Sequence, residues 1–369
     1  MSSTLLRRAL VALAAAPLAV GLAACSGGTT VGAAQSSAAG GSSGSSAAAP
    51  AELRLGYFAN VTHAPALIGV QQGYFTDALG SKTKLTTQVF NAGPDEVEAL
   101  FAGGLDAAYI GPSPTINAYA QSQGDAIRII AGAASGGAEL VVKDAIKSAS
   151  DLKGKTLASP QLGNTQDVAL RTWLTSKGLK NSVTGGGDVT VTPTANADIP
   201  NLFDSGQLDG AWVPEPYAST LVLSHGAHVL VDEKSLWPKG QFVTTQLIVR
   251  TDFLKQYPDA VAALLKAHVK AVKYAQDDAA GAKKAVNAGL QAAGSKSLAD
   301  NVLDRAWSEL SVTYDPIAST LKTSMQNAVK AGTTAQKVDL SGIYDLRPLN
   351  TVLKAQNLST VSAGGLGSQ

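Results

Sequence analysis

The sequence is poor in the residues that build metal sites and disulfide frameworks. Its 369 residues include one cysteine and four histidines, and no histidine lies in an HxH or HExxH array. One cysteine cannot form an intrachain disulfide scaffold, a cysteine-based zinc site or an iron–sulfur cluster. The sequence therefore predicts a fold that needs neither a metal nor any other cofactor.

Charge is also scarce. Asp, Glu, Lys and Arg make up 15% of the chain, and the 29 basic and 28 acidic residues leave a net charge of +1. A protein that holds a phosphate backbone needs a basic field, so we expect no nucleic-acid partner. Apolar residues account for 45% of a chain that is longer than one ordinary domain of ~100–200 residues. The chain can therefore bury more than one core.

The first 24 residues have the pattern of a secretory signal. Arg7 and Arg8 precede an apolar run over residues 9–24, which is shorter than the ~20 residues of a membrane span. Residues 22–25 (LAAC) resemble the lipobox of bacterial lipoproteins, whose cysteine is lipidated after cleavage. The resemblance implies an exported protein that is anchored by Cys25 to the outer face of the cytoplasmic membrane. The alternative is a soluble export signal with an accidental cysteine.

The segment after the cysteine has a composition that cannot bury a core. Residues 26–50 are almost wholly Ser, Gly, Ala and Thr. Such a tract behaves as a flexible coil. We therefore expect residues 25–51 to be a lipidated tether that lets the protein work beside a membrane without entering it.

From residue 52 onward, strand patterns alternate with helix starts. Buried strands are expected at 53–58, 85–90 and 106–110, and each is followed by a polar loop and a helical pattern. A later helix is expected from Pro258, with Val261, Leu264, Leu265 and Val269 on one face. This alternation predicts an α/β fold in which each sheet is mainly parallel and flanked by helices.

The pattern repeats at a fixed offset. Thr165 lies 103 residues after Thr62, and Asp209 lies 103 residues after Asp106, each pair in a similar local context. Two landmarks with one offset predict two similar lobes, although α/β units resemble one another locally. We expect the following division of the chain: 1–24 signal peptide, 25–51 tether, 52–137 first lobe, 138–243 second lobe, 244–345 return to the first lobe with C-terminal helices, and 346–369 a frayed tail.

Enzyme motifs are incomplete. Ala149 stands where a P-loop ending at residues 154–156 needs its first glycine, and Thr115 stands where a G-x-S-x-G elbow from Gly111 needs its last. What recurs instead is a strand, a polar loop and a helix start. Ligands of open α/β sheets bind beyond the carboxyl ends of the strands, where helix N-termini offer free N–H groups and positive charge. The sequence therefore indicates a binding site between the lobes.

Four segments resemble one family in the same order. They are residues 55–75 (LGYFANVTHAPALIGVQQGYF), 98–106, 150–156 (SDLKGKT) and 209–217 (DGAWVPEPY). They resemble the solute-binding proteins of the nitrate/sulfonate/taurine class of ABC importers, to which thiamine-precursor binders are similar. The resemblance implies a two-lobed type II periplasmic-binding-protein fold that closes on a ligand by a hinge, near residues 136–138 and 241–245, and delivers it to a permease with its ATPase. It implies no enzyme activity, and we expect a monomer.

By position, the resemblance places the ligand pocket in the strand–helix loops and between the lobes: Asn60, Thr62, His63, Ser113, Thr115, Ser135, Gly136, Asn164, Thr165, Gln166, Trp212 and Glu215. No Lys or Arg lies in these loops, so a sulfonate would be held by N–H groups and hydroxyls. A carboxylate at Glu215 would repel a simple anion unless it met an amine. The expected ligand is therefore taurine or an alkanesulfonate, with nitrate, bicarbonate or a pyrimidine precursor of thiamine as alternatives.

Several of these residues have a purely structural alternative. Glu215 can be a solvent-facing helix cap, His63 a satisfied buried imidazole, and Trp212 a core residue like Tyr109, its counterpart in the repeat. The hydroxyls of Thr62, Ser113 and Thr165 can simply cap helices. Two other functional classes stay open: an enzyme on the same fold, although the pyrimidine synthase has a Cys-rich motif that this chain lacks, and a sensory lipoprotein that binds a protein partner.

Overall fold

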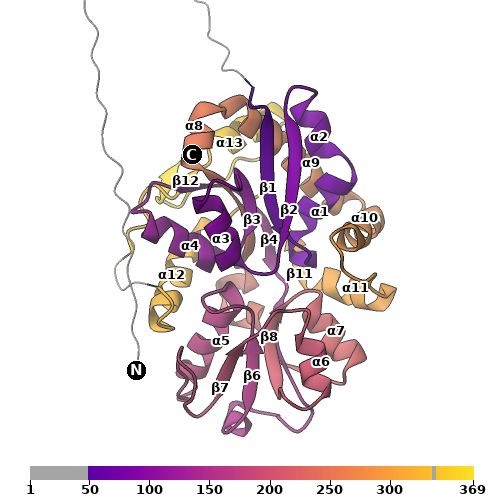
Figure 1. Ribbon diagram of the computed structural model, residues 1–369, viewed down its shortest axis with the longest axis vertical. Coiled ribbons are helices and arrows are strands. Elements are labelled where there is room, and N and C mark those ends of the chain that lie inside the picture. Colours follow the sequence, from indigo (N-terminus) through magenta and orange to yellow (C-terminus); the bar gives the residue numbers. More distant parts are fainter. Residues whose placement is uncertain (1–48, 335–337) are drawn as a thin grey trace, which may run out of the picture. The chain divides into compact units, whose positions relative to one another are not determined.

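The computed structural model describes residues 49–334 and 338–369, which fall in one compact unit (Figure 1). The predicted signal peptide, Cys25 and residues 26–48 of the predicted tether lie outside the described residues. None of the helices in the described ranges is both long and apolar enough to cross a membrane. The described unit contains two β-sheets, and each sheet with its helices forms one lobe (Figure 1).

The sheet of the first lobe has eight strands. Their order is β13 (Gly367–Ser368), β12 (Tyr344–Asp345), β4 (Ile127–Gly136), β10 (Val243–Arg250), β3 (Ala107–Ile110), β1 (Glu52–Phe58) and β2 (Lys84–Phe90), and β11 (Leu310–Val312) pairs with β4. The strands β1, β2 and β3 are parallel to one another, as the alternating pattern predicts. The inserted strand β10 is antiparallel to both β3 and β4, so the sheet is mixed rather than mainly parallel.

The second lobe has a sheet of five strands. Their order is β7 (Thr190–Pro193), β6 (Thr156–Ser159), β8 (Gly210–Pro214), β5 (Ala138–Val142) and β9 (His228–Asp232). The strand β6 is parallel to β7 and β8, whereas β5 is antiparallel to β8 and β9. Only Gly137 separates β4 of the first lobe from β5 of the second. The strand β5 therefore begins at the connection between the lobes and runs antiparallel to β8, which makes the sheet mixed.

Helices cover both sheets. The helices are α1 (Ala64–Gln71), α2 (Tyr74–Leu79), α3 (Gly93–Phe101), α4 (Pro112–Gln121), α5 (Thr165–Ser176), α6 (Ile199–Asp204), α7 (Tyr217–Ser224), α8 (Thr251–Gln256), α9 (Pro258–Asp277), α10 (Ala279–Ala292), α11 (Asp300–Ser308), α12 (Leu321–Lys330) and α13 (Arg347–Ala355). Short 3-10 turns are η1 (Val61–His63), η2 (Ala149–Leu152), η3 (Glu233–Leu236), η4 (Pro238–Gly240) and η5 (Ala318–Thr320). Helices also connect the lobes: α11 contacts β11 and α7, α12 contacts α4 and α5, and α4 contacts α5.

The predicted repeat is visible in the hydrogen bonds of two aspartates. In the first lobe, the Asp106 carboxylate accepts from the amide N of Arg54 at 2.9 Å, and the Asp106 amide donates back to the Arg54 carbonyl. In the second lobe, Asp209 makes the same pair of bonds with Thr156, its carboxylate accepting from the amide N at 2.9 Å. Each aspartate therefore fixes the start of one strand beside another, at equivalent places in the two lobes.

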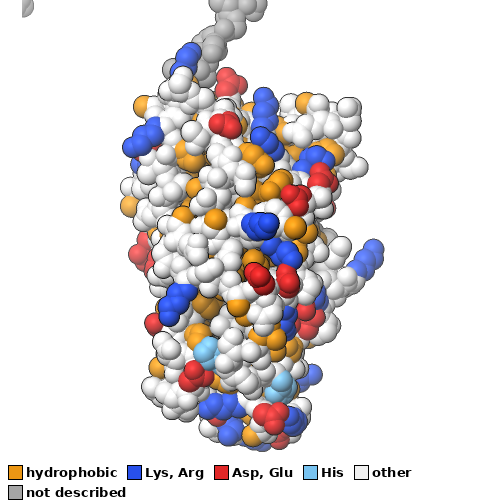
Figure 2. Space-filling view, turned by 90° about the vertical axis from the view of Figure 1, so that its right-hand side faces the viewer, with side chains coloured by type: hydrophobic (Ala, Val, Ile, Leu, Met, Phe, Trp, Pro, Cys, Tyr) orange, Lys and Arg blue, Asp and Glu red, His pale blue; other side chains and the backbone are white. Residues whose placement is uncertain are grey.

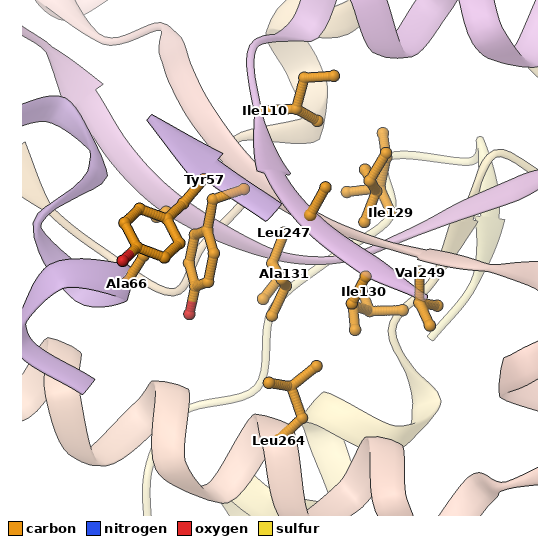
Figure 3. Close-up of a cluster of buried hydrophobic side chains, with 14 of the residues drawn as sticks. Tyr57, Ala66, Ile110, Ile129, Ile130, Ala131, Leu247, Val249 and Leu264 are labelled. Carbon is orange, nitrogen blue, oxygen red and sulfur yellow. The ribbon is translucent and has the colours of Figure 1, made fainter. Parts of the chain in front are cut away.

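The core of the first lobe lies between its sheet and α9. The predicted apolar face of α9 is confirmed: Val261, Leu264, Leu265 and Val269 are all fully buried. Figure 3 shows Leu264 directed toward the sheet, where Ala131 lies on β4. Burial of each large aliphatic side chain contributes roughly 1.5–3 kcal/mol, so this face accounts for much of the stability of the lobe.

The prediction of a frayed C-terminal tail over 346–369 is wrong. Helix α13 packs against α9, with Leu349 and Leu353 fully buried. Beyond it, β13 pairs with β12, and Leu366 is buried. The Gly- and Ser-rich composition concealed an amphipathic helix with apolar residues three and four apart. The last residues therefore belong to the first lobe.

Acidic and basic side chains are mixed on the face of the molecule drawn in Figure 2. In the space-filling view, Lys and Arg side chains alternate with Asp and Glu side chains on the face drawn, and none of the colours forms a broad patch (Figure 2). This agrees with the nearly equal numbers of acidic and basic residues in the sequence.

Candidate functional site

The strand–helix loops of the two lobes meet face to face and form a cleft. Gly111 precedes α4 in the first lobe, and a Cβ atom placed on it would lie only 2.3 Å from Oγ1 of Thr165, the first residue of α5 in the second lobe. The Val61 amide donates to the Glu215 carbonyl at 3.1 Å, and the Gln161 side-chain amide donates to the Asp95 carboxylate at 2.8 Å. The lobes are therefore closed on each other in this structure.

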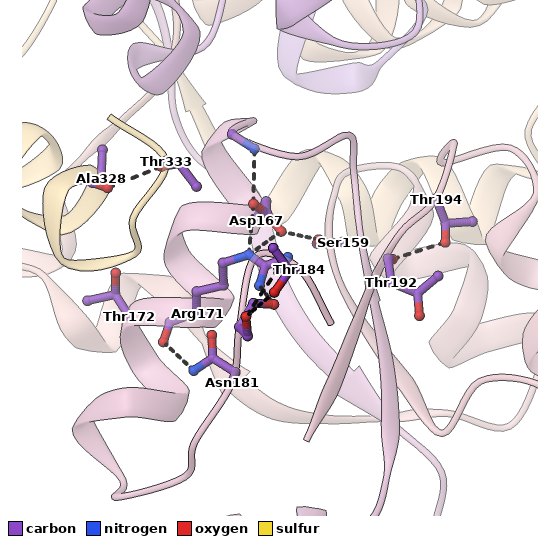
Figure 4. A network of polar contacts seen from close by, with 12 residues as sticks. Ser159, Asp167, Arg171, Thr172, Asn181, Thr184, Thr192, Thr194, Ala328 and Thr333 are labelled. Carbon is purple, nitrogen blue, oxygen red and sulfur yellow. Dashed lines mark hydrogen bonds and ion pairs between the residues drawn. The ribbon is translucent and has the colours of Figure 1, made fainter. Parts of the chain in front are cut away.

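A buried ion pair positions the start of α5. The Asp167 carboxylate accepts from the Ser159 hydroxyl at 2.7 Å, from the Gly163 amide at 3.0 Å and from Nε of Arg171 at 2.9 Å (Figure 4). Both ionic side chains are buried, with 0% and 1% of their surface exposed. These bonds tie the end of β6, the loop and the helix together. They hold Asn164 and Thr165 rigidly at the cleft.

Three buried oxygens at the cleft have no hydrogen-bond partner among the described residues: Oδ1 of Asn164, Oγ1 of Thr165 and Oδ1 of Asn196. The residues that carry them are 3%, 8% and 5% exposed. A buried polar atom without a partner costs about 1–3 kcal/mol. Three such atoms on one side of a closed cleft are the arrangement expected of groups that wait for a ligand.

Two cavities open at the cleft. The first has a volume of about 190 Å³ and is lined by Ser113, Thr165, Trp173, Glu233 and Trp237, together with residues of α12. The second has a volume of about 570 Å³, and Asn60, Asn91, Asn196 and Tyr217 are among its lining residues, with His225 and Lys296. Both cavities draw residues from the two lobes. Among the described residues no cluster of three His, Cys, Asp or Glu side chains could hold a metal ion.

The smaller cavity contains a buried acid that sequence reasoning missed. Glu233 is 2% exposed, and its carboxylate accepts from Nε1 of Trp212 at 2.8 Å and from Nε1 of Trp237 at 3.4 Å. Burial, helped by the Asp232 carboxylate, raises the pKa of Glu233 to about 7. No residue spacing could have revealed this acid, because the loop that carries it has no recognisable motif.

The structure brings about half of the predicted site residues to the cleft. Ser113 and Thr165 line the smaller cavity, Asn60 lines the larger one, and Asn164 lies against Gly93 of the other lobe. Gln166 is buried in the first turn of α5, next to these residues. The ligand role of these residues stays a prediction.

The remaining predicted residues are engaged elsewhere. The Thr115 hydroxyl donates to the Gly111 carbonyl, the Ser135 hydroxyl accepts from the Phe242 amide, and the Gly136 carbonyl accepts from Thr244. Each of these bonds is internal to the strand ends or the lobe connection. Thr62 is buried with its methyl group beside Gly137. Trp212 is fully buried in the core of the second lobe, in edge contact with Trp173.

The Glu215 carboxylate is bonded to other side chains and backbone of the protein. It accepts from the Ser219 amide at 3.0 Å and from Nη1 of Arg305 at 3.0 Å, and it is fully buried. The other Arg305 amino group, Nη2, donates to Glu139 at 2.7 Å. Burial and the Glu139 carboxylate raise the pKa of Glu215 to about 7. The structure therefore does not support a role for Glu215 in recognising a ligand amine, nor does it leave this carboxylate in solvent.

His63 is a buried imidazole whose Nδ1 has a hydrogen-bond partner. Its Nδ1 accepts from the Phe58 amide at 3.2 Å, and its ring stacks on Phe58 with centroids 4.4 Å apart. Burial lowers the pKa of His63 to about 3. We expect the ring to stay neutral between pH 5 and 8, with the proton on Nε2. Long-range proton–nitrogen NMR spectra should show constant His63 nitrogen shifts over this range, and a titration near the ordinary value would contradict the assignment.

Two further cleft residues could have been predicted from their position after the ends of strands. Asn91 follows β2 and Asn196 follows β7, each within three residues of the strand end. The rule that ligands bind beyond the carboxyl ends of strands applies to these strands as well. Only four of the strand–helix loops stood out in the sequence because their Thr, Ser and Pro residues mark helix starts. The loops with asparagine alone carry a weaker signal.

The geometry defines the class of protein before any comparison: two α/β lobes joined at β4–β5 and at β9–β10, with the strand ends of both lobes facing one cleft. This is the two-lobed type II periplasmic-binding-protein fold, as predicted. The chain belongs to the NMT1-like family, which matches residues 46–289.

Individual proteins agree with this assignment. A Bacillus subtilis (strain 168) protein named for binding aliphatic sulfonates is 27% identical over 338 residues, which cover 85% of this chain and 90% of that protein. The taurine-binding periplasmic protein of Escherichia coli (strain K12) is 28% identical over 205 residues, 55% of this chain and 61% of that protein. The solved alkanesulfonate-binding protein of Xanthomonas axonopodis pv. citri, bound to MOPS, has a TM-score of 0.65 at 24% identity over 79% of this chain and 97% of its own.

Proposed function

We propose that this protein is an extracytoplasmic solute-binding lipoprotein of an ABC importer. In this proposal it captures a small sulfonate, taurine or an alkanesulfonate, between its two lobes and delivers it to the permease. One observation carries the proposal: three buried oxygens of the second lobe, without partners among the described residues, lie at the cleft that the first lobe closes. The names of the relatives from Bacillus subtilis and Escherichia coli support the sulfonate class.

The cleft has the chemistry to hold an anion without a cationic side chain. The helices α4 and α5 begin at the smaller cavity, with Ser113 near the start of one and Thr165 at the start of the other. Helix N-termini present unpaired N–H groups, and each stabilises a negative charge by about 0.3–1 kcal/mol, rising to ~2 kcal/mol when sheltered. The hydroxyls of the two residues add donors for sulfonate oxygens. In the described part of the chain, no Lys or Arg lines this cavity.

The same proposal gives a role to the N-terminal segment and to the connections between the lobes. Cys25 would carry the lipid anchor and residues 25–51 would form the tether, of which residues 25–48 lie outside the described residues. The protein would bind and release its ligand unchanged, so it would not be an enzyme. The connections at residues 136–138 and 241–245 would be the hinge, because the chain passes between the two sheets beside these residues.

A thermal-shift screen of the purified protein tests the ligand class. The panel contains taurine, ethanesulfonate, nitrate, bicarbonate, sulfate and a hydroxymethyl-aminopyrimidine. A ligand present at ~100 times its dissociation constant adds about 2.7 kcal/mol to the free energy of unfolding, which raises Tm by several degrees. We expect such a shift with taurine or ethanesulfonate. A shift with nitrate or the pyrimidine alone would overturn the sulfonate assignment, and a flat panel would contradict it.

A further inference from the structure

Among the residues that the structure describes, the buried acid Glu233 has no cationic partner. Its two oxygens accept only from the neutral indole N–H groups of Trp212 and Trp237, and it takes part in none of the ion pairs formed among the described residues. By contrast, the buried acids Glu139 and Glu215 share the guanidinium of Arg305. A buried carboxylate without a counter-ion is strongly disfavoured. A cation brought by a ligand would relieve this penalty.

The lining of the cavity that contains Glu233 combines groups of opposite polarity. Ser113 and Thr165 bring the N-termini of α4 and α5, helices of 10 and 12 residues, whose partial charges are positive. Oγ1 of Thr165 has no partner among the described residues. Glu233 supplies the negative charge of the same cavity, and Trp173 and Trp237 supply aromatic walls. Its volume of about 190 Å³ suits a molecule of a few heavy atoms.

We propose that Glu233 binds the protonated amine of a small zwitterionic ligand whose anionic group lies at the N-termini of α4 and α5. The inference rests on the proposed function and narrows its substrate class to small amino-sulfonates. A primary ammonium has three N–H donors, and the Glu233 carboxylate offers it two acceptor oxygens in this cavity. The indole rings add cation–π attraction. In this proposal Glu233 binds the ligand amine, the role that the sequence predicts for Glu215.

The proposal predicts that ligand binding releases a proton from Glu233. Glu139 of β5, Asp232 of β9 and Lys239 of η4 are charged groups on the elements packed against η3, and of these only Asp232 raises the pKa of Glu233, which is about 7. Lys234 on η3 is paired with Asp232 and Glu309, and Asp167 and Arg171 of α5 pair with each other. At pH 7, about half of the free protein therefore carries a protonated Glu233. An ammonium ligand would expel that proton.

Isothermal titration with taurine and ethanesulfonate tests the inference. The two ligands share a two-carbon sulfonate and differ in the amine. We expect wild-type protein to bind taurine at least about tenfold more tightly, and Glu233→Gln to abolish that preference while ethanesulfonate affinity changes less than about threefold. Glu215→Gln is the matched control, with the taurine preference retained. Titration of taurine at pH 7 in two buffers of different ionisation enthalpy should show release of about half a proton, and ethanesulfonate should show none.

The outcomes separate this inference from the proposed function. Equal affinities for the two ligands, or an unchanged preference in Glu233→Gln, would overturn the role of Glu233 and leave a sulfonate-binding protein. If neither sulfonate binds, the proposed ligand class fails, and ethylammonium then decides the inference. Quenching of tryptophan fluorescence by millimolar ethylammonium in wild type but not in Glu233→Gln would support an amine site. No response in either protein would refute it. A melting curve of each variant confirms that it folds.

Discussion

Replacing Arg305 with methionine should lower the free energy of unfolding by about 3–5 kcal/mol at pH 8. Arg305 donates to Glu139 at 2.7 Å and to Glu215 at 3.0 Å, and both carboxylates are buried in the second lobe. Without the guanidinium, two negative charges stay buried next to each other with no counter-ion. Methionine keeps much of the length of the side chain, so the loss reflects charge more than packing.

The loss should shrink as the pH falls. Burial already raises the pKa of Glu139, and it raises that of Glu215 to about 7. A carboxyl group whose pKa is raised by folding destabilises the native state as the pH rises, so protonation near pH 5 relieves the variant. Urea denaturation at pH 5 and pH 8 measures the difference. The triple variant with Glu139→Gln and Glu215→Gln should recover most of the stability at pH 8, and an equal loss at both pH values would contradict the ion-pair explanation.

Introducing valine at Gly111 should weaken ligand binding by at least about 100-fold, the effect of losing a closed state that ligand contacts depend on. A Cβ atom at Gly111 would lie 2.3 Å from Oγ1 and 3.4 Å from Cβ of Thr165 in the other lobe. The backbone of Gly111, with φ of −75°, accepts any side chain. The fold of each lobe should therefore survive while the lobes are kept apart. Calorimetry with the ligand found in the panel, and small-angle scattering with and without it, measure both effects.

A pair of milder variants isolates the steric effect. Gly111→Ala should weaken binding in the wild-type background, because the new methyl group overlaps the Thr165 hydroxyl. In a Thr165→Ala background that hydroxyl is absent, and the remaining contact of 3.4 Å is ordinary. Gly111→Ala should then cost little beyond the effect of Thr165→Ala alone. The same cost in both backgrounds would show that the approach of these two residues does not limit closure.

Local sequence patterns predict most helices and strands. They do not predict contacts between residues that lie far apart in the chain. Thr165 begins α5 as expected, and the 103-residue offset of Asp106 and Asp209 identified two side chains that make the same bonds in two lobes. Helix starts and strand ends depend on neighbouring residues, so short windows contain their signal. The Gly- and Ser-rich composition of the tail predicts fraying, whereas the spacing of the apolar residues in α13 indicates a helix.

The sequence predicts the cleft in outline but not the partners of the acids beside it. Glu215 stands at the right strand end, but Arg305, 90 residues further along the chain, neutralises it. Glu233 follows no motif, and only the packing of Trp212 and Trp237 brings it into the cavity. Contacts of this kind arise when the two sheets and α11 come together. They leave no trace in the spacing of residues along one segment.

The position of β10 has a consequence for the order of folding. All five strands of the second sheet lie between residues 138 and 232, whereas the first sheet needs β10, β11, β12 and β13, which all follow the second lobe in the chain. During synthesis the second lobe can therefore be completed first, while β3 and β4 still lack the strand that joins them and expose open edges. The N-terminal strands emerge earliest yet become stable last. A nascent chain is most vulnerable to misassembly in that interval.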